Sequence, residues 1–381
     1  KTTWGQGPNH GATTSNTKKY IDFAAKHGFK GVLVEGWNQG WDGDWIKNGD
    51  QFSFTKPYND FDIKEITDYA LSKGVRLIGH NETGGAVLNY EAQVEDAFEF
   101  YNNHGVRAVK TGYVNHGPSI KRIDENGDVQ LETHHGQFMV QHYQKVNDLA
   151  IQHQIMLNVH EPIKATGLRR TYPNMMTREG ARGQEFNAWS PDGGNPPEHE
   201  TILPFTRMLA GPMDFTPGIF DLTFEEAKPD NRVNTTLAKQ LALYVVFYSP
   251  FQMAADLPEN YEANLKPFKF IVDVPCDWAD TRVLNAEIGE YITTVRKDRN
   301  SSDWYLGSIT DENERSFSID LDFLEDGKEY LAQIYKDGEG ADWESNPYPV
   351  EILEETATKD SQIEIKLAAG GGQAIRFIQI N

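Results

Sequence analysis

The stretch FKGVLVEGW at residues 29–37 is apolar for most of its length and then reaches a charged residue, Glu35. Its apolar residues do not alternate with polar ones, which is typical of a strand buried on both faces of a parallel sheet. Three later stretches have the same character: VRLIGHNE at 75–82, AVKTGYV at 108–114 and MLNVHE at 156–161. We therefore expect four parallel strands over these ranges.

A stretch with helical character precedes each of these strands: 16–27, 63–73, 91–103 and 137–153. Repeated helix–strand units between residues 29 and 290 predict an α/β fold of the (β/α)8 TIM-barrel type. An open doubly wound sheet is the alternative, but it usually carries a glycine-rich first turn, and no G-x-G-x-x-G motif follows any strand. Residues 180–186 and 212–218 are weaker strand candidates, and 237–251 predict a helix that runs into a strand-like segment.

The predicted barrel has expected limits at both ends. Residues 1–14 are polar and glycine-rich, like a loop that leaves a strand, so we expect the first barrel strand upstream of Lys1. Near residue 295 the sequence changes to short alternating stretches, which predict antiparallel strands at 316–321, 329–335, 362–367 and 374–380. The sequence thus predicts a barrel over 1–295 and a small antiparallel β-sandwich over 296–381.

The composition limits the classes of partner. Lys and Arg total 36 and Asp and Glu total 57, so the formal net charge is −21. Nucleic acids and anionic membranes require clustered basic residues, so we expect neither as a partner. Apolar runs such as 241–248 are much shorter than the ~20 residues of a membrane-spanning helix, so we expect no membrane insertion. The single cysteine, Cys276, cannot form a disulfide within the chain.

Charged and aromatic residues stand at the ends of the four predicted strands: Glu35 and Trp37, His80 and Glu82, Lys110 and Tyr113, and His160 and Glu161. In a barrel, the carboxyl ends of the strands face the active site, so we expect these side chains to line one site. Glu179 and Glu185 follow in a stretch rich in arginine. Glutamates grouped with histidines can carry out acid–base chemistry and can bind a hard cation.

Tryptophans cluster near the N-terminus, at Trp4, Trp37, Trp41 and Trp45. Sugars stack on aromatic faces, so the cluster is consistent with a carbohydrate cleft. Packing beneath long loops explains any single one of these tryptophans equally well.

At these residues the sequence resembles glycoside hydrolase family 97, and it is most similar to the calcium-dependent inverting α-glucosidases of the Bacteroidetes starch utilisation system. The matching stretches include HGATT at 10–14, HNET at 80–83, VKTGYV at 109–114 and the specific block NVHEPIKATGLRRTYPNMMTREGARGQEFNAW at 158–189. The resemblance implies an enzyme that cleaves terminal α-glucosidic bonds of malto-oligosaccharides, requires Ca²⁺ and acts in the periplasm.

The resemblance also implies a role for each candidate residue. Glu185 resembles the general acid, and the pair that activates the attacking water as general base is matched by Glu82 and Glu161. The calcium ligands are matched by Glu161, Glu179 and Glu185. The sugar-contacting groups are matched by Glu35, His80, Lys110 and His160, with Trp37 beside them.

One position separates inverting from retaining members of the resembled family. Retaining members place an aspartate nucleophile two residues after the strand lysine, and here Gly112 stands two residues after Lys110. A glycine has no side chain that can attack carbon, so the base must act through water. Inverting glycosidases leave room for that water, with carboxyl groups roughly 6.5–9.5 Å apart. We therefore expect inversion.

The sequence differs from the resembled family at two places, and two other functions remain as alternatives. The family's N-terminal β-sandwich, which supplies one more calcium-ligating glutamate, is expected upstream of Lys1. Residues 115–135 form a longer segment than in the relatives and are interpreted as a surface loop or as part of the cleft entrance. Within it, DENGD at 124–128 is interpreted as a hairpin turn. An α-galactosidase of the same family and a non-catalytic carbohydrate-binding fragment are the alternative functions.

Overall fold

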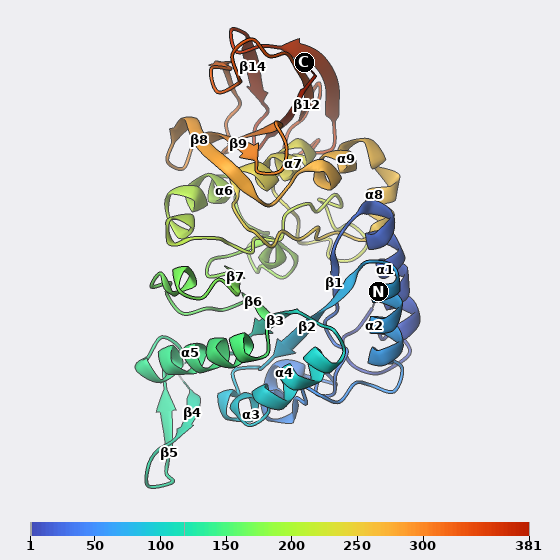
Figure 1. Cartoon of the computed structure of the whole chain (residues 1–381), viewed down its shortest axis with the longest axis vertical. Helices are drawn as coiled ribbons and strands as arrows, with labels where there is room; N and C mark the ends of the chain where they lie inside the picture. Colours follow the sequence, from blue (N-terminus) through green and yellow to red (C-terminus); the bar gives the residue numbers. More distant parts are fainter. Residues whose placement is uncertain (1, 118, 381) are drawn as a thin grey trace. The chain divides into compact units, whose positions relative to one another are not determined.

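In the computed structural model, which describes residues 2–117 and 119–380, the chain divides into one unit that ends at Gly180 and another that begins at Ala181. The first unit contains the strand–helix repeats, and the second contains the antiparallel strands (Figure 1). The predicted fold class, an α/β TIM barrel followed by an antiparallel β-sandwich, is confirmed. No helix within the described residues is long and apolar enough to span a membrane.

The first unit is built on a five-stranded sheet in which every neighbouring pair is parallel. In spatial order its strands are β1 (Gly31–Leu33), β2 (Arg76–Glu82), β3 (Ala108–Gly112), β6 (Met156–Val159) and β7 (Met175–Arg178). The four strands expected from the unbroken apolar runs are therefore present, although β1 is shorter than its run. Three residues of the run pair with β2, and these three form β1.

Helices precede these strands in the chain and lie on the outer side of the sheet (Figure 1). They are α1 (Thr14–His27), α2 (Ile63–Ser72), α3 (Val87–Glu91), α4 (Val94–Asn103) and α5 (Gln137–Gln152). The side chains of Thr13 and Asp62 cap the first two of these helices at their N-termini. The core between helices and sheet is apolar and aromatic, which fixes the sheet beneath the site.

Residues 115–135 contain a hairpin of β4 (Ile120–Ile123) and β5 (Val129–Glu132), which projects beyond α5 in Figure 1. Its turn is the DENGD stretch, as predicted. The carboxylate of Asp124 accepts hydrogen bonds from the backbone N–H groups of Asn126 and Asp128, both at 2.9 Å. The acidic side chain therefore stabilises the turn itself.

Two of the weaker strand predictions are wrong. The strand expected at 180–186 lies earlier, as β7, and the 3-10 helix η4 (Gln184–Ala188) follows it. Gly180 has a φ of 78°, in the left-handed region, which ends the extended run. Residues 212–218 are irregular apart from one bridge residue, because Thr216 and Gly218 have φ values of 58° and 94°.

The second unit begins with helices and ends with the β-sandwich. Its helices are α6 (Glu198–Ile202), α7 (Leu237–Val246), α8 (Pro258–Ala263) and α9 (Leu265–Asp273). The helix expected over 237–251 is thus present as α7, but the strand-like segment after it is not a strand. Every residue of α7 is buried, and Arg296 of the sheet donates to the carbonyl oxygen of Val245 at 2.6 Å. This helix therefore forms the floor on which the sandwich packs.

The sandwich consists of a six-stranded antiparallel sheet and a two-stranded sheet that share one apolar core. The larger sheet contains, in spatial order, β13 (Val350–Ala357), β12 (Tyr330–Asp337), β15 (Gly372–Gln379), β10 (Trp304–Thr310), β9 (Tyr291–Asp298) and β8 (Trp278–Glu287). The smaller sheet pairs β11 (Arg315–Asp320) with β14 (Gln362–Leu367).

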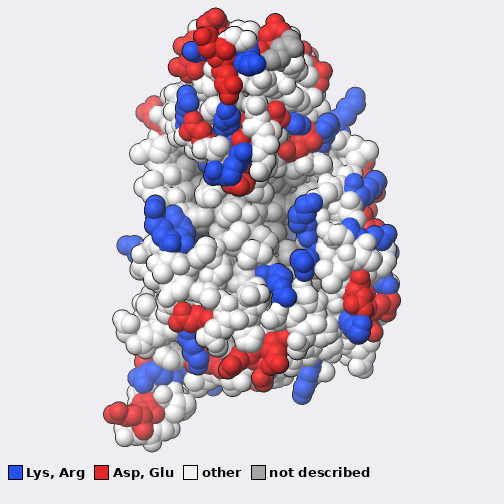
Figure 2. Space-filling view, viewed as in Figure 1, with Lys and Arg blue, Asp and Glu red and all other residues white. Residues whose placement is uncertain are grey.

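The antiparallel sheet starts at Trp278, before the expected boundary of 295/296. Residues 278–298 belong to it because β8 pairs with β9 and β9 pairs with β10. At the opposite edge, β13 exposes Glu351, Glu354 and Glu355, and Figure 2 shows acidic side chains gathered over these C-terminal strands. Charges on an edge strand discourage pairing with other chains.

Candidate active site

The candidate residues of the first unit lie at the carboxyl ends of its parallel strands. In the sheet register, His80 pairs with Lys110 and Glu82 pairs with Gly112. His160 and Glu179 directly follow β6 and β7, and their backbone N–H groups still donate to neighbouring strands, at 2.8 and 2.9 Å. Parallel strands end at the same edge of a sheet, so the fold brings these side chains to one place, as the sequence predicted.

Glu35, Lys110 and His80 form a buried charged cluster. The ammonium of Lys110 donates to Glu35 Oε1 at 2.8 Å, and His80 Nε2 lies 3.5 Å from the same oxygen. Burial alone raises the pKa of Glu35, but the positive charge of Lys110 outweighs it and holds this pKa at about 2. Burial lowers the pKa of His80 to about 4, against the opposing influence of Glu35. At neutral pH the cluster is thus an ionised glutamate, a lysine ammonium and a neutral histidine.

Glu82 is buried at the end of β2, with 4% of its surface exposed. Its Oε1 accepts hydrogen bonds from the backbone N–H groups of Gly84 at 2.7 Å and Val114 at 3.1 Å. Burial, and then the negative charge of Glu161, raise the pKa of Glu82 well above its usual range. A carboxylate in this environment is a stronger base than one in water.

Glu161 follows β6 and has a backbone φ of 44°, in the left-handed region that non-glycine residues rarely adopt. Its Oε2 accepts a hydrogen bond from the backbone N–H of Tyr113 at 2.7 Å. Its carbonyl oxygen accepts two more, from the Tyr143 hydroxyl at 2.8 Å and from His134 Nε2 at 2.6 Å. Both ends of this residue are therefore held.

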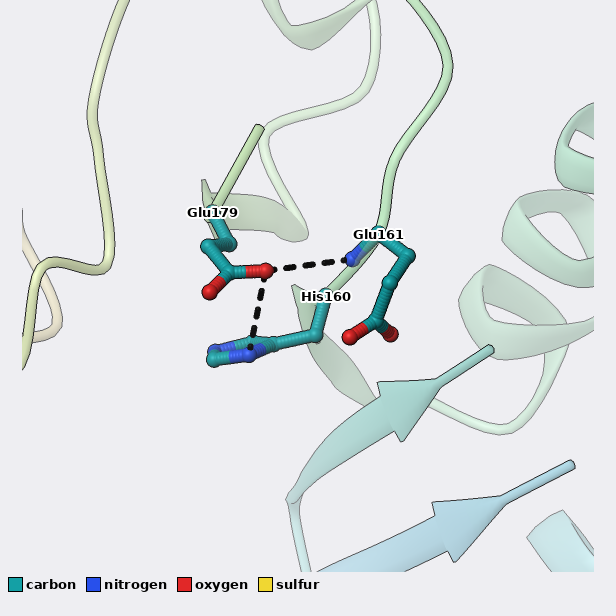
Figure 3. Close-up of side chains that lie close together, drawn as sticks. All are labelled: His160, Glu161 and Glu179. Carbon is teal, nitrogen blue, oxygen red and sulfur yellow. Dashed lines mark hydrogen bonds and ion pairs between the residues drawn. The ribbon is translucent and has the colours of Figure 1, made fainter. Parts of the chain in front are cut away.

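His160, Glu161 and Glu179 form a group that can hold a metal ion. One ligand atom from each residue lies within 4.8 Å of the others. His160 Nδ1 lies 3.6 Å from Glu179 Oε2, and the side chains of Glu161 and Glu179 flank His160 in Figure 3. Two carboxylates suit a hard cation such as Ca²⁺, whereas imidazole is preferred by softer metals. The donor set therefore fits calcium through Glu161 and Glu179.

Gly112 lies directly against the Glu82 carboxylate. A Cβ atom placed on Gly112 would be 2.0 Å from Glu82 Oε2. The φ of Gly112 is not in the left-handed region, so the backbone itself does not require glycine. The side chain of Glu82 occupies the space that a side chain at residue 112 would need.

Trp37 does not line the site. Its indole is 2% exposed and packs in the core against Phe61, Phe100 and Tyr101. The prediction that it lines the site beside the sugar-contacting groups is corrected, because its side chain is buried in the core and its indole N–H donates to the carbonyl oxygen of His80 at 3.3 Å.

Trp4, Trp41 and Trp45, the other tryptophans of the N-terminal cluster, pack together next to His80. The Trp41 ring stacks on the His80 ring at 5.6 Å, and Trp45 and Trp4 continue this aromatic group outward. Of these residues, Trp4 is the most exposed, at 47%.

Glu185 belongs to the second unit, where it is exposed on η4. Its neighbours in the short helix are anchored: the backbone N–H of Gln184 donates to the carbonyl of Phe215 at 2.8 Å, and Asn187 Oδ1 accepts from the Asn195 N–H at 2.7 Å. Buried, hydrogen-bonded residues on either side thus fix the short helix that carries the exposed Glu185.

Two residues that hold Glu161 were not predicted from the sequence. His134 lies at the end of the segment interpreted as a surface loop, and Tyr143 lies on α5. No motif marks either residue. One signal could have pointed to His134: it stands two residues after the predicted hairpin, where the chain comes back from the hairpin.

Two family profiles match the chain. The profile described as "Glycoside hydrolase 97" matches residues 1–181, and the profile described as "Glycosyl-hydrolase 97 C-terminal, oligomerisation" matches residues 277–378.

Curated relatives carry a more specific name. The chain is 30% identical over 377 residues to a protein of Bacteroides thetaiotaomicron named retaining alpha-galactosidase, covering 96% of this chain and 51% of that protein. It is 28% identical to a probable retaining alpha-galactosidase of Streptomyces bingchenggensis, covering 79% of this chain and 41% of that protein. The chain thus spans about half the length of these relatives, or less.

Solved structures give a higher similarity. A glycoside hydrolase family 97 enzyme from Pseudoalteromonas sp. strain K8 is 58% identical, with a TM-score of 0.96, covering 100% of this chain and 58% of that chain. That enzyme was solved with acarbose, and a variant of it with panose. A beta-arabinopyranosidase is 18% identical with a TM-score of 0.70, which shows a shared fold.

The charged cluster gives a testable expectation. The depressed pKa of Glu35 means that its ionised form contributes stability above its ordinary pKa of 4.5, and this contribution is lost as the pH falls through about 2. In Lys110→Met the ammonium that lowers the pKa of Glu35 is gone, and burial should raise this pKa above 4.5. The free energy of unfolding should then fall as the pH rises through the raised pKa of Glu35. We expect a loss of ~3 kcal/mol at pH 7, measured by urea denaturation with a ¹³C NMR titration of the carboxyl group.

Lys145→Met is the matched control. Lys145 pairs with Glu91 at 2.7 Å, is half exposed, and leaves His142 as a second partner of that glutamate. We expect a loss below ~1 kcal/mol. Equal losses in the two variants would contradict the assigned role of Lys110.

Proposed function

Because the chain belongs to glycoside hydrolase family 97, we propose that it hydrolyses terminal α-glucosidic bonds of malto-oligosaccharides with inversion of the anomeric centre, assisted by Ca²⁺. The observation that carries the proposal is the contact between Gly112 and Glu82, where a Cβ would meet the carboxylate oxygen at 2.0 Å. Because the Glu82 carboxylate lies where a side chain of residue 112 would begin, this position offers no carboxylate that could attack the sugar. A periplasmic location, expected from the resemblance, is part of the same proposal.

The glycine at residue 112 supports the proposal of inversion. A retaining glycosidase needs a carboxylate that attacks the sugar directly, whereas an inverting one needs a base that activates water. Residue 112 cannot supply a nucleophile, and burial beside Glu161 raises the pKa of Glu82, which makes its carboxylate a stronger base. We assign the activation of water to Glu82 and Glu161, and the protonation of the glycosidic oxygen to Glu185.

The other residues bind and orient the sugar in this proposal. Glu35 is ionised and accepts hydrogen bonds from sugar hydroxyls, while the ammonium of Lys110 donates them and keeps Glu35 ionised. His80 is neutral, so it offers a donor and an acceptor without a competing charge. His160 lies beside Glu179 and contacts the same sugar.

Calcium is part of the proposal through Glu161 and Glu179, whose carboxylates suit it, and through Glu185 by the resemblance. When bound, Ca²⁺ supplies positive charge that stabilises developing negative charge. The protein residues have a further task at this position: Tyr113 donates its backbone N–H to Glu161 Oε2, which orients one carboxylate oxygen.

Glucose is favoured over galactose by the relative from Pseudoalteromonas, which was solved with acarbose and, as a variant, with panose, a trisaccharide of α-linked glucose. The alternative, an α-galactosidase, is favoured by the names of the curated relatives. These relatives are named retaining enzymes, and Gly112 speaks against a retaining mechanism here. We therefore propose the glucosidase.

The stereochemical prediction is tested with p-nitrophenyl α-glucoside and proton NMR, because this substrate releases only the glucose whose anomeric carbon has reacted. We expect β-glucose to form first, and α-glucose to appear only as mutarotation proceeds, because water attacks from the face opposite the leaving group. The p-nitrophenyl α-galactoside serves as the comparison substrate and should be cleaved at least about tenfold more slowly, a difference that one lost sugar contact can produce. Early accumulation of α-glucose would refute inversion, and a preference for the galactoside would favour the alternative function.

The contact between Gly112 and Glu82 is tested by Gly112→Ala. We expect kcat to fall about 100-fold, because the new methyl group must displace the carboxylate of the base. Gly117→Ala is the matched control, since a Cβ there meets no atom within 4 Å and its φ is not in the left-handed region. Thermal melting checks that both variants fold. An unchanged kcat in Gly112→Ala would show that the position of Glu82 does not matter for turnover.

Calcium is tested by chelation. We expect EDTA to abolish maltose hydrolysis and Ca²⁺ to restore it, while in Glu179→Gln the restoring concentration should rise about 10- to 100-fold because one carboxylate ligand is lost. Activity that survives exhaustive chelation would remove calcium from the proposal. If the chain shows no hydrolysis in either condition but still binds maltose, the carbohydrate-binding alternative is supported.

A further inference from the structure

The main chain at Glu161 is held in a conformation that its own side chain does not favour. The φ of 44° lies in the left-handed region, where a Cβ crowds the following carbonyl. Such conformations persist when surrounding contacts fix them, and they cluster at functional sites. Contacts from other residues must therefore fix the backbone of Glu161.

Two side chains donate to the carbonyl oxygen of Glu161. The Tyr143 hydroxyl lies at 2.8 Å and His134 Nε2 at 2.6 Å. A carbonyl oxygen can only accept, so the hydrogen of His134 is on Nε2. Neither side chain touches the carboxylate. They act on the backbone of the residue, while the N–H of Tyr113 orients its carboxylate at 2.7 Å.

Both donors are themselves fixed by aromatic packing. His134 is 4% exposed and contacts the His116 ring at 4.4 Å. The Tyr143 ring lies 4.9 Å from that of Tyr113, whose hydroxyl is hydrogen-bonded to His142 Nε2 at 2.8 Å. The hairpin of residues 120–132 thus returns the chain so that His134 meets α5 at the site.

We propose that His134 and Tyr143 are positioning residues for Glu161: they hold its left-handed backbone, and through it the direction of its carboxylate. The inference rests on the proposed function, in which Glu161 activates water and binds calcium. It assigns a purpose to the 115–135 segment, whose end supplies one of the two donors.

The test uses the full chain and four substitutions. Tyr143→Phe removes only the hydroxyl, and His134→Leu removes the ring donor. His134→Gln keeps an amide nitrogen near the place of Nε2. Tyr305→Phe is the control, because its buried hydroxyl donates to a backbone carbonyl, that of Asp273, at 3.0 Å, and it lies on β10 of the sandwich.

We expect kcat on maltose to fall about 10- to 100-fold in Tyr143→Phe and His134→Leu, as for a misplaced catalytic group, with KM changed less than about twofold. His134→Gln should recover most of the loss. Tyr305→Phe should keep kcat. A kcat within about twofold of the wild type in both Tyr143→Phe and His134→Leu, or the same loss in Tyr305→Phe, would overturn the positioning role.

A second readout separates this inference from the proposed function. Calcium affinity, measured by calorimetry with Ca²⁺ alone, should weaken about tenfold in Tyr143→Phe and in His134→Leu, as for other partners that orient a metal ligand. If the wild type cleaves no α-glucoside but these affinities fall, the proposed function fails and the positioning role stands. If the wild type is active and Glu161→Gln is not, but neither kcat nor calcium affinity changes in the two variants, the positioning role fails alone.

Discussion

The register of β2 against β3 sets the chemistry of the site, because it places Glu82 opposite Gly112. At that pair the carboxylate of one strand fills the space above the other. A larger residue at 112 would move Glu82, and a shift of one residue in the register would turn Glu82 away from the site. The backbone N–H groups of Gly84 and Val114 then fix the carboxylate in place. The pairing of β2 with β3 therefore places the Glu82 carboxylate in the site and leaves little space for a second carboxylate on residue 112.

The same edge of the sheet holds acidic groups in contrasting states. Glu35 remains ionised because the ammonium of Lys110 lies 2.8 Å away, and its pKa is about 2. Glu82 has a raised pKa because it is buried near another carboxylate. Carboxyl groups whose pKa values are driven apart can take different roles at one pH. Here the strongly ionised group suits binding and the more basic group suits proton transfer.

Much of this arrangement could be predicted from the sequence, for one physical reason. The strands β2, β3 and β6 are buried on both faces, so their apolar runs are unbroken, and parallel strands bring the residues that follow them to one edge. His160, Glu161 and Glu179 converge for this reason. The segment at 212–218 failed because Thr216 takes a left-handed backbone that no apolar pattern reveals. The prediction for Trp37 failed because the direction of a side chain after a strand depends on packing. The two donors to the Glu161 carbonyl could not be predicted because one comes from the turn after β5 and the other from helix α5, neither of which carries a motif.

The crowding at Gly112 also limits which residues can replace this glycine. The curated relatives are named retaining enzymes, whereas in this chain a side chain at residue 112 would have to displace the Glu82 carboxylate. An aspartate introduced alone would meet the Glu82 carboxylate. A shortened Glu82 alone would leave Glu161 as the remaining one of the two carboxylates that we propose activate water. Any variant designed to carry a carboxylate nucleophile at residue 112 would therefore have to move or shorten Glu82 as well, so the two positions are coupled in design.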